Sequence, residues 1–112
     1  MLDALQRIET LLRAYGHTYE ANLAAIAQTR FACDPLAGCR AVNNDEWWDD
    51  QHSVAAIDLA IDGGFTAQAR SDAQTLRAAL IEVYTTMLAY GERHPTGELE
   101  VAQFRKWMES HI

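Results

Sequence analysis

The sequence predicts an all-α protein, a compact bundle of five or six helices joined by short connections. Apolar residues recur at intervals of three and four along most of the chain, which is the period of a helix with one buried face. No stretch of four or more residues alternates between apolar and polar in the period of a strand. With 112 residues, 49% of them apolar, the chain can bury its own core, and residues 1–112 are expected to form a single helical domain.

Three helices are expected in the first half of the chain. The first covers about residues 2–15, because one stripe holds Leu5, Ile8, Leu12 and Tyr15, and Gly16 would end it. A second helix is expected to follow, with a similar spacing of residues on its inward face, namely Tyr19, Leu23, Ile26 and the stem of Arg30. Asp34-Pro35 indicates a new helix, with Asp as the cap and Pro at the first helical position. This third helix should end near Asn43-Asn44.

The second half is expected to contain three further helical segments. Ser53 can cap a helix that ends at Gly63-Gly64, with an inward face made of Val54, Ile57 and Ile61. The clearest helix covers about residues 71–91. It opens with a capping box formed by Ser71 and Gln74, and its seam is expected to hold Leu76, Leu80, Val83, Met87 and Tyr90. A turn at 91–97 precedes a last helix that carries Val101, Phe104, Trp107 and Met108.

An acidic segment with two adjacent tryptophans gives the first indication of function. Residues 41–69 contain six acids and no Lys or Arg, in a chain with a net charge of −7. Such a field attracts a basic partner and repels nucleic acid, and Trp is enriched at the centres of protein interfaces. The candidate partner-binding residues are therefore Asp45, Glu46, Trp47, Trp48, Asp49, Asp50, His52, Asp58 and Asp62.

The orientation of the two tryptophans has two interpretations. Neighbouring helical positions point about 100° apart, so we expect one of Trp47 and Trp48 to face the core and the other to be exposed at least in part. The alternative is that both rings cover the end of the bundle and donate their N–H groups to carbonyls.

The same acids permit an enzymatic alternative. Glu46 with Asp50, and Asp58 with Asp62, form i, i+4 carboxylate pairs, which could hold Mg²⁺ or Mn²⁺ as in helical nucleotide pyrophosphatases. However, residues 41–69 supply no base for the phosphates, and the chain has neither a glycine-rich phosphate loop nor a Gly-x-Ser-x-Gly turn. We therefore predict no enzyme activity, no metal and no cofactor.

The cysteines and the N-terminus bear on the compartment. Cys33 and Cys39 fit no zinc or thioredoxin spacing, so two reduced thiols are the preferred interpretation, with a disulfide or a metal pair left open. The N-terminus has no apolar signal region and no segment reaches the length of a membrane span. A cytoplasmic protein that contacts no membrane is expected.

A family resemblance rests on Trp47-Trp48 followed by Ser53 and Asp58 in a helix-rich chain. At these positions the sequence resembles small all-helical bacterial immunity-type proteins, which are encoded beside polymorphic or contact-delivered toxins. Members often have glycines between the Trp pair and the Ser, where this chain has residues 49–52. The resemblance implies one cognate toxin as partner, inhibited by occlusion of its active site. A homodimeric helical scaffold, with an apolar face covered by a second copy, is a third alternative.

Overall fold

The computed structural model describes residues 1–49, 53–57 and 67–110, with side chains through Trp107. These residues form six α-helices, one 3-10 turn and no strand, which confirms the all-α class. The elements in chain order are α1 (Leu2–Ala14), α2 (Thr18–Cys33), α3 (Pro35–Ala41), α4 (Asp45–Trp48), η1 (Val54–Ala56), α5 (Ala67–Ala89) and α6 (Pro95–Ser110).

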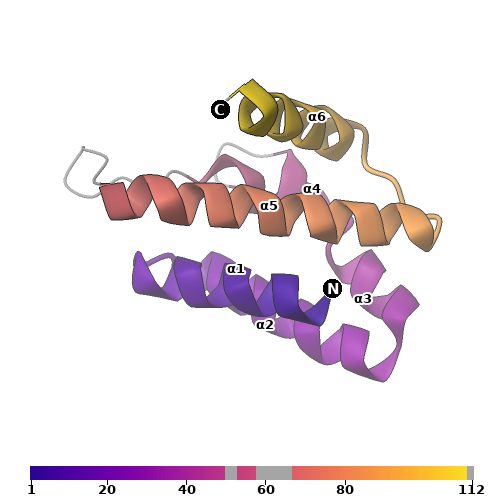
Figure 1. The fold of residues 1–112 in the computed structure, drawn as a ribbon. Helices are drawn as coiled ribbons and strands as arrows, with labels where there is room; N and C mark the ends of the chain where they lie inside the picture. The colour runs from indigo at the N-terminus through magenta and orange to yellow at the C-terminus, as the bar shows by residue number, and fades with distance from the viewer. Residues whose placement is uncertain (50–52, 58–66, 111–112) are drawn as a thin grey trace.

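The longest helix, α5, lies in the middle of the bundle (Figure 1). Helix α1 packs along one side of α5, and α6 packs along another. Helix α2 packs against α1 and α3, while α4 packs against η1 and α6. The single turn of α4 thus packs against two other elements, and these contacts cover both of its tryptophans.

Local sequence signals explain where several of the helices begin and end. Gly16 takes a φ of 83° after α1, a left-handed conformation that residues with a Cβ rarely adopt. The Asp34 side chain accepts a hydrogen bond from the backbone N–H of Leu36, and Pro35 begins α3. These two boundaries are as the sequence predicts.

The core is built from the predicted stripes of α1 and α5, but not from that of α2. Buried residues on α1 and α5 include Leu5, Ile8, Leu12, Leu76, Leu80, Val83 and Met87, all predicted to face inward. In α2 the buried positions are Ala21, Ala24 and Ala27. Tyr19 is 63% exposed and Ile26 is 49% exposed, so the expected inward stripe of α2 is wrong. The alanine face has no bulky side chains, which allows α1 to approach closely.

Three further expectations differ from the structure. Helix α5 begins at Ala67, so Ser71 lies inside it and no capping box forms there. Tyr90, expected in the α5 seam, follows the last residue of that helix and is 45% exposed. Ser53 is followed only by the 3-10 turn η1, because Ile57 already has extended backbone. The remainder of that predicted helix, with Ile61 and Gly63-Gly64, lies outside the described residues.

Among the helices in the described part of the chain, none is long and apolar enough to cross a membrane.

Candidate functional site

The tryptophan pair belongs to the core. Trp47 and Trp48 are each 1% exposed, so the expectation that one ring is exposed is wrong, and neither can act as a surface anchor for a partner. The prediction assumed that α4 has one buried face and one exposed face. This helix has only four residues and packs against both η1 and α6, so more than one of its faces is covered. Two side chains about 100° apart can then both be buried.

The Trp48 ring fixes the position of α4 against α5 and α6. Its Nε1–H donates a hydrogen bond of 2.7 Å to the carbonyl of Val42. Its ring meets Tyr84 of α5 edge to face, with centroids 5.4 Å apart. A Cβ added at Gly97, in the first turn of α6, would lie 3.1 Å from Trp48 Cγ and 2.9 Å from Tyr84 Cε1. The absence of a side chain at Gly97 therefore allows α6 to approach both rings.

His94 connects the start of α6 to both α4 and α5. Its Nδ1 accepts a hydrogen bond of 3.1 Å from the backbone N–H of Gly97, so the proton of the neutral ring is on Nε2. This Nε2 donates to Asp45 Oδ1 at 2.9 Å. The Tyr84 hydroxyl accepts from the His94 backbone N–H at 3.1 Å and donates to its carbonyl at 3.0 Å. Asp45 is thereby held by a buried residue while its own side chain stays 75% exposed.

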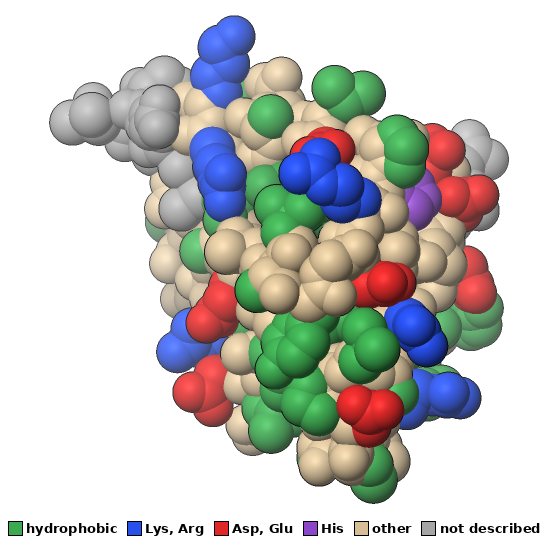
Figure 2. All heavy atoms as spheres, turned by 90° about the vertical axis from the view of Figure 1, so that its right-hand side faces the viewer, with side chains coloured by type: hydrophobic (Ala, Val, Ile, Leu, Met, Phe, Trp, Pro, Cys, Tyr) green, Lys and Arg blue, Asp and Glu red, His purple; other side chains and the backbone are tan. Residues whose placement is uncertain are grey.

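Three exposed carboxylates of the α4 segment form the centre of the candidate site, together with the partly buried Glu100 of α6. We call Asp45, Glu46, Asp49 and Glu100 the acidic face. The Glu46 carboxylate accepts a hydrogen bond from the Tyr19 hydroxyl, which holds it in place as His94 holds Asp45. Figure 2 shows acidic side chains gathered near a histidine along one edge of the molecule.

Glu100 is included in the acidic face because its carboxyl group interacts with the charge of Asp49. Burial raises the pKa of the Glu100 carboxyl above its ordinary value, and the negative charge of Asp49 raises it further. Sequence reasoning missed Glu100, because it lies 51 positions after Asp49 in a segment with ordinary charge balance. A signal was present in the helical spacing, since Glu100 stands one position before the inward residue Val101.

The structure brings together only part of the predicted site. Asp45, Glu46 and Asp49 share the acidic face, whereas Trp47 and Trp48 lie beneath it in the core. Four predicted site residues lie outside the described part of the chain and are neither placed nor excluded, namely Asp50, His52, Asp58 and Asp62.

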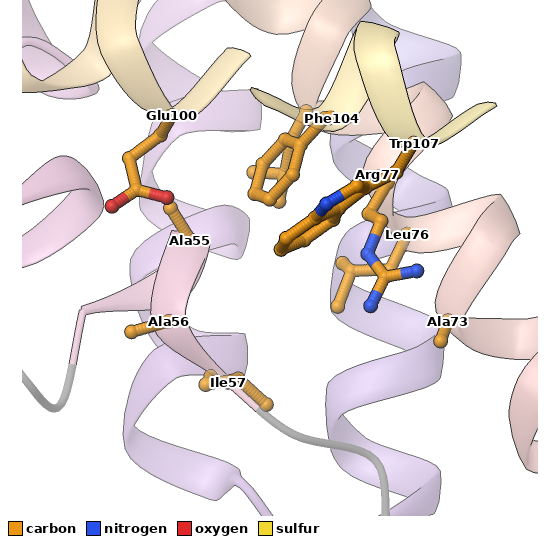
Figure 3. Close-up of a pocket in the computed structure, with 10 residues that line it drawn as sticks. Ala55, Ala56, Ile57, Ala73, Leu76, Arg77, Glu100, Phe104 and Trp107 are labelled. Carbon is orange, nitrogen blue, oxygen red and sulfur yellow. The ribbon is translucent and has the colours of Figure 1, made fainter. Parts of the chain in front are cut away.

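A cavity of about 390 Å³ adjoins the acidic face through Glu100. Its walls come from η1, α5 and α6, and the residues are mostly apolar (Figure 3). At one side the Arg77 guanidinium lies over the Trp107 ring, 5.0 Å from the ring centroid. The cavity therefore combines an apolar floor with one basic and one acidic group at its rim.

Among the described residues, no group of three or more His, Cys, Asp or Glu side chains is placed to hold a metal ion. The Cys33 and Cys39 thiols are both free, with Cys33 exposed and Cys39 buried. Burial also raises the pKa of the Cys39 thiol above its ordinary value, which keeps this sulfur in the thiol form. The described part of the acidic face offers exposed carboxylates, which suit the recognition of positive charge.

Comparisons of this chain with protein-family models, with curated proteins and with solved structures found no match.

Proposed function

We propose that this chain is an immunity-type protein that binds a basic toxin through the acidic face and covers the toxin's active site. The observation that carries the proposal is the set of three exposed carboxylates on the short α4 segment, Asp45, Glu46 and Asp49. Toxins that act on nucleic acids or nucleotides have basic clefts, and carboxylates can occupy such a cleft in place of phosphates.

The proposal gains support from the way these carboxylates are held. Asp45 is fixed by His94 and Glu46 by Tyr19, so both side chains have lost rotamer freedom before any partner arrives. Ordering a flexible side chain at an interface costs about 0.5–1.5 kcal/mol, and a preorganised group avoids most of that cost. Because both side chains remain exposed, they stay accessible to basic groups of a partner.

The cavity beside Glu100 could receive an anchoring side chain of the partner, whereas the sequence predicted that a tryptophan of this chain is the anchor. Interface hot spots are enriched in Trp, Tyr and Arg side chains that lie in well-packed, desolvated pockets near the centre of the interface. With both tryptophans buried, the anchor in this proposal comes from the toxin, whose aromatic side chain enters the mostly apolar cavity between α5 and α6. The acidic face then speeds the approach of the toxin and orients it, and the cavity buries the anchoring side chain away from water.

A growth assay tests the proposal. The product of the open reading frame adjacent to this gene is expressed from an inducible promoter, alone and together with this chain. We expect growth arrest with the product alone and normal growth when both are present. A double variant, Glu46→Gln with Asp49→Asn, should protect poorly, because it removes two charges of the acidic face.

A matched control separates the acidic face from net charge. Asp3 and Glu82 are exposed on α1 and α5 and do not belong to the acidic face, and the double variant Asp3→Asn with Glu82→Gln also removes two negative charges. This control should protect as well as the wild type. Equal loss of protection in both double variants would show that overall charge matters and that the acidic face is not the binding site. A neighbouring product that is harmless when expressed alone would refute the immunity role.

A further inference from the structure

The outward side of α2 carries residues that a core would normally cover. Tyr19 is 63% exposed, Ile26 is 49% exposed, and Leu23 between them is half-buried. Arg30, one further turn along, is exposed. We call Tyr19, Leu23, Ile26 and Arg30 the α2 stripe. These four positions lie within about 60° of one another around the helix axis, so they form one continuous surface.

The spacing of the α2 stripe is the same in both directions along the helix. Its four residues are separated by steps of four, three and four. When two copies of such a helix are laid antiparallel, Leu23 of one copy faces Ile26 of the other, and Tyr19 faces Arg30. Steps of four and three are also those of helices that pack along each other with interlocking side chains. The stripe is therefore complementary to itself under a two-fold rotation, as an isologous dimer interface must be.

Charge distinguishes the antiparallel pairing from the parallel one. At the Tyr19 end, the Tyr19 hydroxyl donates to the Glu46 carboxylate, and the charge of Glu20 lies close by. Both carboxylates raise the pKa of the Tyr19 hydroxyl, with the hydrogen bond to Glu46 as the largest cause. The other end of the stripe carries the Arg30 guanidinium. Antiparallel pairing places each guanidinium beside an aromatic ring and an acidic group, whereas parallel pairing places Arg30 against Arg30.

We propose that two copies of this chain associate through their α2 stripes as an antiparallel, two-fold symmetric dimer. The interface centres on Leu23 and Ile26 and ends on two Tyr19–Arg30 contacts. A helix of 16 residues is about 24 Å long, so the contact is small and the dimer dissociates on dilution. The dimer does not depend on the toxin, and it forms with the protein alone.

Sedimentation velocity over a wide concentration range tests the association. We expect wild-type protein to shift from monomer to dimer as concentration rises. Ile26→Asp should weaken dimerisation by about 30-fold or more, the effect expected for a central interface residue that enters the contact twice. The matched control is Leu99→Asp on α6, since Leu99 is 72% exposed and lies outside the stripe. This control should dimerise like the wild type, and circular dichroism of both variants checks that the helices are retained.

Disulfide trapping tests the antiparallel register. In this register the two Cys33 residues lie about 25 Å apart along the helix axes, so oxidation of the wild type should give no covalent dimer. Two copies of residue 23 are offset by only about 4.5 Å along the axes, so Leu23→Cys combined with Cys33→Ser should give a covalent dimer on mild oxidation.

Several outcomes would overturn the proposal. Protein that stays monomeric at every concentration excludes the dimer. A covalent dimer through native Cys33 shows a parallel register or another interface. If Ile26→Asp leaves self-association unchanged but abolishes growth protection, the α2 stripe belongs to the toxin interface and not to a second copy. Tyr19 links the α2 stripe to the acidic face through its hydrogen bond to Glu46. The two failures can still be told apart, because Ile26 is not part of the acidic face and the sedimentation test uses no toxin.

Discussion

Replacement of Trp48 by Ala tests the most consequential packing contact of the structure. The ring is 1% exposed, donates a hydrogen bond to Val42 and meets Tyr84 edge to face. Removing a buried aromatic ring costs about 3–5 kcal/mol when the surroundings relax only in part. We therefore expect the free energy of unfolding to fall by about 4 kcal/mol, out of the roughly 5–15 kcal/mol that a domain of this size has.

Urea denaturation followed by circular dichroism measures this loss. With a denaturant slope of about 1.5 kcal/mol per molar, the midpoint should fall by roughly 2–3 M. Trp107→Ala is the matched control, because that ring is 46% exposed although it packs beside Phe104 and Arg77, and its removal should therefore cost clearly less than that of the fully buried Trp48 ring. If Trp48→Ala destabilises the protein no more than Trp107→Ala does, the assignment of Trp48 to the core is wrong.

Three further changes probe how α6 and the residue before it pack against the rest of the protein. Gly97→Ala places a Cβ 2.9 Å from Tyr84 Cε1 and should lower the free energy of unfolding by about 1–3 kcal/mol; a more stable variant would contradict the close approach of α6. Tyr84→Phe leaves the buried N–H of His94 without its acceptor and should cost about 1–3 kcal/mol in the same denaturation assay, with no loss expected if water replaces the hydroxyl. Glu100→Gln should raise the melting temperature at neutral pH, because the folded pKa of this carboxyl lies above 4.5 and its charged form opposes folding. That advantage should disappear as pH falls through the folded pKa to below 4.5, and a constant difference across this range would contradict the burial of Glu100.

The helix boundaries that the sequence predicts correctly have strong local causes. Gly16 and Asp34-Pro35 act through backbone conformation and capping within one or two residues, so no knowledge of the fold is needed. The α5 seam is equally local, because large apolar residues repeat at helical spacing over several turns. The capping box at Ser71 failed because the preceding Ala67, Gln68 and Ala69 favour helix themselves and extend α5 toward the N-terminus.

The predictions were wrong where packing between segments distant in sequence determines which side chains are buried. In α2 the larger apolar side chains indicated one inward face, but close contact with α1 places the alanines there. Both tryptophans are buried because α6, about fifty residues later, covers α4. The acidic face was predicted in part, since three of its carboxylates are near one another in sequence. The helical spacing shows that Glu100 lies next to an inward position of α6, but only the packing of α6 brings it beside Asp49 and forms the cavity next to it.

Association kinetics with the product of the adjacent open reading frame test the proposed function most directly. The association rate is measured by surface plasmon resonance at low and physiological ionic strength. For wild type and for the Asp3→Asn, Glu82→Gln control, we expect fast association that slows as salt rises, because exposed charges are screened over about 8 Å at physiological ionic strength.

The double variant Glu46→Gln with Asp49→Asn should associate about fivefold to tenfold more slowly at low salt and respond less to added salt, while its dissociation rate changes little. Circular dichroism confirms that its helices are retained. This result would support recognition of a basic toxin by the acidic face. An association rate equal to that of the control at every ionic strength would contradict it.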